Sequence, residues 1–354
     1  MRIKEIAQAL SGRLVGDGTI EINRLVHPDR AEFESDLALA MGGDAVAALT
    51  RSKAQAVVVS AKNPAPPEYF KAILTVDDPR MALAKLTGLF DSGPQYSAGV
   101  HPTAIVAPDA TLGEGVCIGA YAVVGQNSRI GAGTLILPHV TIGGGVVIGT
   151  HCQLYAGVRI ADRVTLGDRV IIHANSVIGS DGFSFAPEMN SPTGFGPGVV
   201  VTRVHSLGSV VISDDVEIGA CTTIDRSTIE TTRIGRGTKI DNHVHIGHNV
   251  TIGESCIVCG MVGIAGSVVI GNRVRLGGGV GIGDHVAIGD EAVVGAGSGV
   301  GTNVAAGAFV SGQPAMPHHR ALEQYLYAGR QKRLHEKVDG LASRLDAMER
   351  TNQK

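Results

Sequence analysis

The chain has 354 residues, of which 49 are glycine, whereas aromatic residues make up only 4% and tryptophan is absent. Glycine at twice its usual share of about 7%, combined with 44% apolar residues, argues against disorder and indicates a regular, compact repeat. A net charge of −3 gives no electrostatic case for nucleic-acid binding. With no signal peptide and no apolar run of about 18 residues, we expect a cytoplasmic protein with free thiols and at most peripheral membrane contact.

Residues 1–97 lack any short repeat and mix two kinds of segment. Ile3–Leu10 and Pro79–Phe90 have the composition of helices, and Ala56–Val59 and Ile73–Val76 are apolar runs typical of strands. We therefore predict a small α/β domain over residues 1–97.

Residues 98–312 carry a six-residue repeat. An aliphatic residue recurs at every sixth position from Val100 to Ile178, and the pattern resumes at Ile212 and, after four extra residues, runs from Ile234 to Val300. Three hexads close one triangular coil of 18 residues, and coils stack about 4.8 Å apart, the spacing of hydrogen-bonded strands. The glycine that often follows the aliphatic residue suits a corner, because glycine admits backbone conformations that other residues avoid. The repeat predicts a mainly β prism of about ten coils.

Two segments depart from the repeat. Residues 180–209 are too long for a turn, and we expect a loop or finger that projects from the prism and has a function. Residues 313–354 form a polar, helical C-terminal extension. Its apolar residues are spaced by four and three, as in a coiled-coil seam that caps the prism or contacts another subunit: Leu334, Val338, Leu341, Leu345 and Met348.

The densest polar cluster is KIDNHVHIGHNV, residues 239–250. On the 18-residue period His248 stacks with Gly266 one coil later and with Asp284 two coils later. This ridge places an imidazole beside an exposed glycine N–H, which suits acyl transfer through a general base and an oxyanion hole. The alternative is a solvated face, which is the usual explanation of isolated surface histidines such as His139 and His151.

A metal site is a further alternative. His243 and His248 are five residues apart, which resembles the β-helix carbonic anhydrases, in which histidines of two subunits hold zinc. No third ligand is apparent, and we predict no metal. Cys256 and Cys259 form a Cys-x-x-Cys pair, but Cys256 occupies an inward position of its hexad, as Cys152 does, so packing explains it better.

The hexads resemble those of the left-handed parallel β-helix acyltransferases. Within residues 212–290 the match is closer: EIGACTTIDRSTIETTRIGRGTKIDNHVHIGHNVTIG, followed by GIAGS and GGGVGIGDH, resembles the UDP-3-O-acyl-glucosamine N-acyltransferases of lipid A biosynthesis. This resemblance implies a homotrimer with active sites between neighbouring prisms. It also implies a UDP-acyl-amino-sugar acceptor and a 3-hydroxyacyl donor on acyl carrier protein. The phosphopantetheine arm belongs to that carrier, so the chain itself needs no cofactor.

The same resemblance assigns roles to individual residues. His248 would take a proton from the 2-amine of the sugar, Asp241 would orient that imidazole, and the N–H of Gly266 would hold the oxyanion. Four further residues would contact substrate: His285, Asn242, Phe183 and Phe185. A groove for a long acyl chain would pass the small residues Ser298, Gly299 and Gly301.

The N-terminal domain departs from the family pattern. The stretch LALAMGGDAVAALT has no aromatic ring where the family has an Asn-Pro-Lys-Tyr-like segment that stacks on uracil. The finger reads GFSF in place of Gly-Phe-Gly-Phe/Tyr. Two other functions therefore stay open beside the zinc alternative: an acetyl-CoA-dependent sugar acetyltransferase, and a non-catalytic scaffold that binds a nucleotide sugar or a partner.

Overall fold

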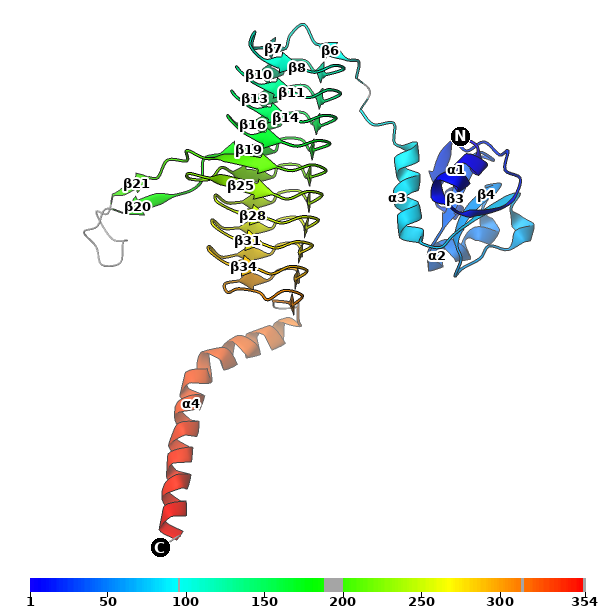
Figure 1. The fold of residues 1–354 in the computed structure, drawn as a ribbon. Coiled ribbons are helices and arrows are strands. Elements are labelled where there is room, and N and C mark those ends of the chain that lie inside the picture. The colour runs from blue at the N-terminus through cyan, green and yellow to red at the C-terminus, as the bar shows by residue number, and fades with distance from the viewer. Residues whose placement is uncertain (95, 188–199, 313–314, 353–354) are drawn as a thin grey trace. The chain divides into compact units, whose positions relative to one another are not determined.

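The computed structural model describes all residues except 95, 188–199, 313–314 and 353–354 (Figure 1). The chain divides into two compact units, Met1–Gln95 and Tyr96–Lys354. Among the helices of the described residues, none is long and apolar enough to cross a membrane.

The N-terminal unit is a five-stranded sheet with helices. The strand order is β1-β5-β4-β3-β2, with β1 antiparallel to β5 and the other pairs parallel. The strands are β1 (Arg13–Gly16), β2 (Arg24–Val26), β3 (Asp36–Ala40), β4 (Ala56–Ser60) and β5 (Ala72–Val76), and the helices are α1 (Ile3–Leu10), α2 (Gly43–Ala47) and α3 (Pro79–Phe90), with single 3-10 turns at Pro28–Arg30, Leu49–Arg51 and Pro67–Tyr69.

Both predicted helices of this unit are confirmed, and β4 and β5 contain the predicted strands. Helix α3 begins where the Asp78 carboxylate accepts hydrogen bonds from the N–H groups of Arg80 and Met81, with proline in the first turn. Buried side chains of α1 and α3, such as Ile6 and Leu86, pack on one side of the sheet. The unit therefore has a core of its own.

The second unit is a triangular prism with three parallel sheets, which we call faces 1, 2 and 3 in the order in which the chain visits them. Face 1 has eleven strands: β6 (Gly99–Val100), β9 (Cys117–Ile118), β12 (Leu135–Ile136), β15 (Gln153–Leu154), β18 (Ile171–Ile172), β23 (Glu217–Ile218), β26 (Lys239–Ile240), β29 (Ile257–Val258), β32 (Arg275–Leu276), β35 (Val293–Val294) and β37 (Phe309–Val310). Face 2 has ten: β7 (Ile105–Val106), β10 (Val123–Val124), β13 (Thr141–Ile142), β16 (Arg159–Ile160), β19 (Val177–Ser180), β24 (Thr223–Asp225), β27 (His245–Ile246), β30 (Gly263–Ile264), β33 (Gly281–Ile282) and β36 (Gly299–Val300). Face 3 has nine: β8 (Thr111–Leu112), β11 (Arg129–Ile130), β14 (Val147–Ile148), β17 (Thr165–Leu166), β22 (Ser209–Ile212), β25 (Thr231–Ile234), β28 (Thr251–Ile252), β31 (Val269–Ile270) and β34 (Ala287–Ile288).

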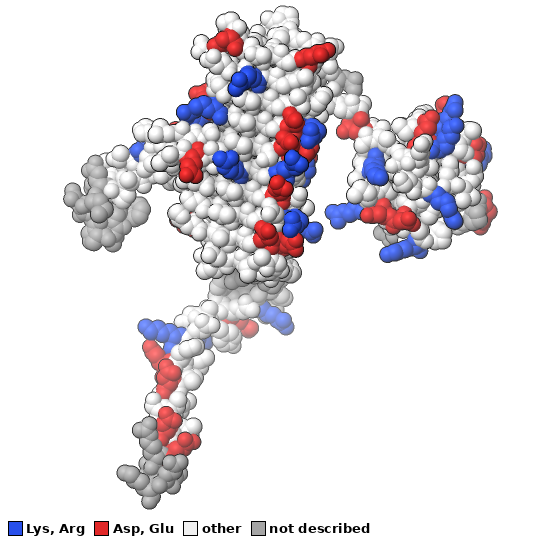
Figure 2. Space-filling model, viewed as in Figure 1, with Lys and Arg blue, Asp and Glu red and all other residues white. Residues whose placement is uncertain are grey.

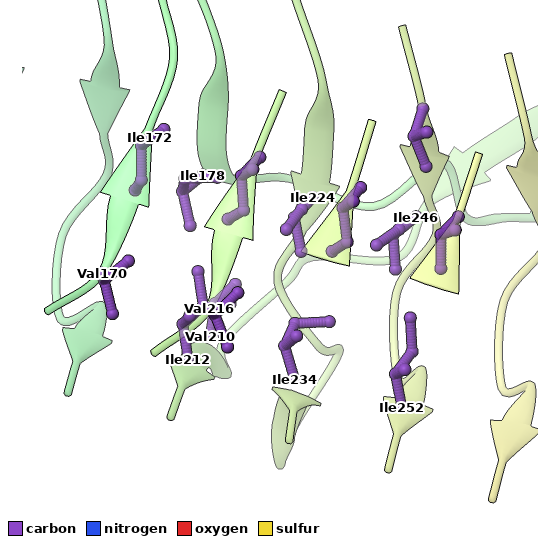
Figure 3. Packing of buried hydrophobic residues seen from close by; sticks show 14 of the residues in the cluster. Val170, Ile172, Ile178, Val210, Ile212, Val216, Ile224, Ile234, Ile246 and Ile252 are labelled. Atoms are coloured by element: carbon purple, nitrogen blue, oxygen red, sulfur yellow. The ribbon is translucent and has the colours of Figure 1, made fainter. Parts of the chain in front are cut away.

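The strand register confirms the 18-residue coil. Val123 pairs with Thr141 and Thr141 pairs with Arg159, so each of these strands lies on the one 18 residues before it. The step is 46 residues where the finger intervenes, as between Thr165 and Val211, and 22 where the four extra residues do, as between Thr223 and His245. The aliphatic residue of each hexad points inward, and Figure 3 shows isoleucines and valines of successive coils stacked on one another in the interior. Cys152 and Cys256 are buried in this core, as predicted. The fold class is the predicted one, a left-handed parallel β-helix.

The glycines that follow the aliphatic residues have another reason than the one expected. A Cβ built on Gly125 would lie 2.5 Å from the backbone of Gly143 in the next coil, and its φ is not positive. The left-handed position of that corner falls two residues later, at Asn127. Glycine is therefore required here because neighbouring coils approach closely, and the left-handed residue of a corner tolerates side chains.

Residues 180–209 include a two-stranded antiparallel hairpin, β20 (Phe185–Pro187) and β21 (Val201–Arg203), that projects from the prism (Figure 1). The expected finger is thus present, although residues 188–199 lie outside the described residues. Within the described residues, the predicted helical C-terminal extension is one helix, α4 (His318–Asn352). All five residues of the predicted seam are more than half exposed in the single chain: Leu334, Val338, Leu341, Leu345 and Met348.

Charged side chains gather along one edge of the prism, away from the hairpin (Figure 2). At the corner between faces 3 and 1, Arg169 contacts Asp215 at 2.6 Å and Arg273 contacts Glu291 at 2.8 Å, each pair bridging two neighbouring coils. Exposed pairs of this kind contribute little energy individually. These four side chains join neighbouring coils at the surface, and none of them lines the cavities described below.

Candidate active site

His248 lies at the corner between faces 2 and 3, directly after β27. Its imidazole lies between two glycines: a Cβ on Gly182 would come within 2.8 Å of Cδ2, and one on Gly266 within 2.6 Å of Cε1. Nδ1 is buried and has no hydrogen-bond partner among the described residues. Two glycine backbones therefore lie against the ring, and because Nδ1 is buried, Nε2 is the nitrogen that we expect to meet a ligand.

A cavity of about 530 Å³ opens at this corner. Its lining includes His245 and His248, the carboxyl of Asp225, Phe183 from the base of the finger, and the backbone of Gly266. Pairing of His245 with Gly263 and of Gly263 with Gly281 confirms that His248, Gly266 and Asp284 stack in three successive coils, as the sequence predicted. The cavity thus joins an imidazole, a carboxyl group and a backbone amide.

The N–H of Gly266 makes no hydrogen bond within the described part of the chain. At the same position of other corners, an Asp or Asn side chain of the next coil caps this N–H: Asp162 accepts from Gly144 at 2.8 Å, and Asn272 accepts from Glu254 at 2.9 Å. Asp284 stacks above Gly266 but does not bond to it. An unpaired donor beside an imidazole is available to a developing negative charge.

Within one chain Asp241 and His248 lie at different corners, so a single chain does not bring this carboxylate to the imidazole, and the orienting role of Asp241 stays a prediction. Asp241 lies at the corner between faces 1 and 2, where its Oδ2 accepts the N–H of Gly260 at 3.0 Å and its Oδ1 accepts that of Asn242. It lines a different hollow of about 690 Å³, together with Tyr155 and His173. The carboxylate is occupied in capping the next coil, so the motif KIDN has a structural use here.

The carboxyl beside His248 is Asp225, which sequence reasoning missed. Thr223 pairs with His245 across a step of 22 residues, so Asp225 falls beside Gly247 and one residue from His248. The four extra residues after Arg226 hide this neighbour from an 18-residue count. The sequence did contain a signal: the six-residue pattern resumes at Ile234, four residues later than expected after Ile224, which gives the length of the insertion.

The other predicted substrate contacts are distributed over the prism. Asn242 lines the hollow that contains Asp241, and its Oδ1 accepts the N–H of Ala220 at 2.6 Å. His285 is exposed, and its N–H donates to the carbonyl of Gly266. Phe183 lines the His248 cavity and is 85% exposed, with its ring 5.0 Å from that of Phe185 in an edge-to-face contact. The structure therefore brings Phe183, Gly266 and His248 together but leaves Asn242 at another corner.

Within the described ranges, no group of three or more His, Cys, Asp or Glu side chains is arranged to hold a metal ion. His243 belongs to the corner between faces 1 and 2, and His248 to the next corner. Burial raises the pKa of the Cys152 thiol to about 11, which makes it a packing residue rather than a nucleophile.

The N-terminal unit has its own polar hollow, of about 1070 Å³, lined by several basic residues. Two of them are engaged by carboxylates: Arg24 by Asp36 and Arg51 by Asp29. The ring of Phe33 lies under the Arg24 guanidinium, 5.1 Å from its centroid. The segment LALAMGGDAVAALT forms β3 and α2 and has no aromatic ring, so any nucleotide base must be recognised differently here.

Known proteins resemble the chain over most of the prism. The family model "Bacterial transferase hexapeptide (six repeats)" matches residues 122–162, 145–180 and 231–266. UDP-3-O-acylglucosamine N-acyltransferase of Paracoccus denitrificans is 43% identical over 272 residues, 74% of either chain, and that of Parasynechococcus marenigrum is 53% identical over 247 residues, 70% of this chain and 69% of the relative. A solved Arabidopsis UDP-N-acetylglucosamine acyltransferase superposes with a TM-score of 0.53 at 26% identity, over 60% of this chain and 71% of that one.

Proposed function

The chain belongs to the family of UDP-3-O-acylglucosamine N-acyltransferases, and from this premise we propose that it transfers a 3-hydroxyacyl chain from acyl carrier protein to the 2-amine of a UDP-3-O-acyl-glucosamine-type sugar. The proposal rests mainly on one observation: His248 and Gly266 line the same cavity, and the N–H of Gly266 has no hydrogen-bond acceptor among the described residues. An acyl transfer to an amine requires these two elements: a base and an oxyanion donor.

In this mechanism Nε2 of His248 removes a proton as the sugar amine attacks the thioester carbonyl. Imidazole is the side chain best suited to accept and release a proton near neutral pH. The carbonyl oxygen becomes an oxyanion beside the N–H of Gly266. Collapse of the tetrahedral intermediate breaks the carbon–sulfur bond, and the imidazolium returns its proton to the departing thiolate. In this proposal the phosphopantetheine arm belongs to the carrier protein, and the steps above use only His248 and the N–H of Gly266.

Space for the acyl chain is supported by face 2. Gly263, Gly281 and Gly299 occupy the outward position of three successive strands, and a Cβ on any of them would meet nothing within 4 Å. Gly301 is equally open, whereas Ser298 is buried and points inward, where its hydroxyl donates to the carbonyl of Gly295. A side-chain-free stripe beside the base fits an extended 3-hydroxyacyl chain, and we expect the enzyme to prefer long donors.

We also propose a homotrimer with active sites between prisms. Asp241 and His248 lie at different corners of one chain, so only a second copy could bring a carboxylate of the Asp241 corner to the His248 cavity. The exposed seam of α4 supplies a further apolar contact surface. Sedimentation equilibrium tests this point: the proposal requires a particle of three times 36.5 kDa, and a monomer at micromolar concentration contradicts it.

The reaction is tested by measuring N-acyl transfer from 3-hydroxyacyl-acyl carrier protein to UDP-3-O-acyl-glucosamine. His248→Ala should lower kcat by about a hundredfold to ten-thousandfold, the usual contribution of a general base. His151→Ala is the control, because His151 is an exposed residue at the corner between faces 3 and 1. Turnover of acetyl-CoA in place of the carrier-bound donor would favour a sugar acetyltransferase, and full activity of His248→Ala would contradict the mechanism.

A further inference from the structure

Asp225 is a buried carboxyl group that the mechanism above does not use. It ends β24, its side chain is 8% exposed, and its carboxyl lines the same cavity as His248 and Gly266. A buried charge requires compensation from partners, because the protein interior solvates it poorly. The partners of Asp225 therefore indicate what it does.

One carboxylate oxygen is held firmly. The Ser180 hydroxyl donates to Oδ1 at 2.6 Å. Ser180 reaches this position through an irregularity in the pairing of β19 with β24, at Gly179, whose φ is +89°. The buried Arg226 donates its Nε to the carbonyl of Gly179 at 2.6 Å and its backbone N–H to that of Ser180 at 2.8 Å. Residues 225–226 and 179–180 thus fix one another, and the carboxyl has a defined orientation.

The second carboxylate oxygen lies near the imidazole of His245, and His248 lines the same cavity. His245 Nε2 is 4.0 Å from Oδ2, while His245 Nδ1 is hydrogen-bonded to Thr223 at 2.9 Å. Burial raises the pKa of Asp225, whereas the Ser180 bond and the positive charge that His245 and His248 acquire on protonation lower it.

Two further charged groups face this carboxyl. The Asp181 carboxylate adds to the rise in the pKa of Asp225. The Arg226 guanidinium is 3.9 Å from Asp181 and is directed to the carbonyls of Gly179 and Asp162. No cation in the described part of the chain forms an ion pair with Asp225 other than an imidazole.

We propose that Asp225, held by Ser180 and Arg226, is a positioning residue that supplies the negative counter-charge when His248 receives the proton of the substrate amine. Asp225 stays ionised throughout: the proton moves from the amine nitrogen to His248 and then to the thiolate sulfur. The carboxylate and the new imidazolium stabilise each other in a site with few other charges. This inference rests on the proposed function for its kinetic test but not for its spectroscopic one.

The kinetic test compares kcat and KM of the wild type and Asp225→Asn between pH 5.5 and 9. Asparagine keeps the shape and removes the charge, so kcat should fall by about tenfold to a hundredfold with KM little changed. The acid limb of kcat/KM, below which the base is protonated, should move to lower pH by about 0.5–1 unit, a modest effect of a lost opposite charge in a partly solvated cavity. Asp225→Glu, which keeps the charge, should keep the limb in place.

Two matched variants separate this from other effects. Asp290→Asn removes an exposed carboxylate that caps Asn272 at a remote corner, and it should leave the limb where it is. Asp241→Asn is the rival. A limb that moves with Asp241→Asn and not with Asp225→Asn would overturn the proposal in favour of a carboxylate from a second copy.

A pH titration of His248 in the absence of substrate tests the role of Asp225 whether or not the proposed reaction is correct. In protein labelled with ¹³C at histidine Cε1, the His248 signal, assigned by its loss in His248→Ala, should titrate at lower pH in Asp225→Asn than in the wild type. Failure of the wild type to acylate the sugar would contradict the proposed function alone. An unchanged His248 titration in a folded Asp225→Asn protein would overturn the role of Asp225. If Asp225→Asn fails to fold, Ser180→Ala, which frees the carboxyl, should still lower kcat, and an unchanged kcat would count against the proposal.

Discussion

Among the described residues, each of the two units buries one aspartate, and the two carboxyl groups have opposite surroundings. In the N-terminal unit Asp36 is 1% exposed and accepts four hydrogen bonds: two from the Arg24 guanidinium, both at 2.9 Å, and two from the N–H groups of Glu32 and Phe33. The Arg24 bond is the largest influence and lowers the pKa of Asp36 to about 2, against the effect of burial. In the prism Asp225 has one hydroxyl donor, and burial raises its pKa.

The number and kind of hydrogen-bond partners distinguish a buried carboxylate that stabilises the fold from one that serves a reaction. A carboxylate with a cation and four donors stabilises the fold that holds it. A buried carboxylate with one hydroxyl donor and one imidazole 4.0 Å away costs stability, and such groups are characteristic of sites where the charge is needed for chemistry. His248 Nδ1 and the N–H of Gly266, both unpaired in the described residues of the same corner, fit that interpretation.

The largest effect on stability is expected when Asp36 loses its cationic partner, so that it is left, like Asp225, as a buried carboxylate without a Lys or Arg partner. Arg24→Ala removes the only cation that forms an ion pair with Asp36 among the described residues and leaves a buried carboxylate, which should destabilise the N-terminal unit by about 3 kcal/mol. Hydrogen exchange of the β3 and β4 amides in the full chain measures this loss. Arg30→Ala is the control, since Arg30 is exposed and forms no ion pair in the described structure. Equal protection in the two variants would show that the ion pair does not stabilise the unit.

A loss of similar size is expected in activity from filling the space around His248. In Gly266→Ala the new methyl group would overlap Cε1 and Nε2 of the imidazole, so the ring must move. A displacement of about 1 Å in a catalytic group costs roughly a hundredfold in kcat/KM. Gly278→Ala is the matched control: it occupies the same position at the corner between faces 1 and 2, where the nearest atom is 3.4 Å away. Comparable activity of the two variants would remove Gly266 from the site.

Most of the fold was readable from the sequence, because the repeat is local. One aliphatic residue in six fixes the strand, the coil and the inward direction at once, and the register then follows by counting. Helix α3 was predicted with its observed bounds, Pro79–Phe90, from its composition. What the hexad could not show was the reason for its glycines, since the contact that excludes a Cβ at Gly125 comes from a residue 18 positions later.

The site was harder to predict, for a physical reason. His248 and Gly266 are one uninterrupted coil apart, so the period placed them together correctly. Asp225 is separated from His248 by an insertion, and an 18-residue count from Gly247 leads to Ile229, which is exposed. The role of Asp241 came from the family motif KIDN, but strand β27 lies between Asp241 and His248 and places the two at different corners of one chain.

The pH dependence of stability should have opposite signs in the two units. The folded pKa of Asp36, about 2, lies below the usual value near 3.9, so its stabilisation is complete above about pH 4 and is lost as the pH falls towards 2, a change of about 2 kcal/mol. Exchange of the β3 amides, corrected for the intrinsic effect of pH, should follow this loss. In Asp36→Asn the free energy of unfolding should change with pH by about 2 kcal/mol less between pH 4 and pH 2 than in the wild type. Identical pH profiles of the two proteins would contradict the comparison.

The smallest effect separates the two aspartates most directly. The pKa of Asp225 is raised on folding, so its ionised form opposes folding at neutral pH. The free energy of unfolding therefore declines as the pH rises through the folded pKa of Asp225. Asp225→Asn should therefore leave the free energy of unfolding at pH 7.5 unchanged or raise it by up to about 1 kcal/mol, while Asp36→Asn lowers it. Urea unfolding of the full chain, followed by far-UV circular dichroism and by exchange in β24 and β27, measures both variants. A loss of 2 kcal/mol or more in Asp225→Asn would make Asp225 a structural residue like Asp36. Its unpaired oxygen would then need a donor from a neighbouring subunit, because one hydroxyl bond does not compensate a buried carboxylate.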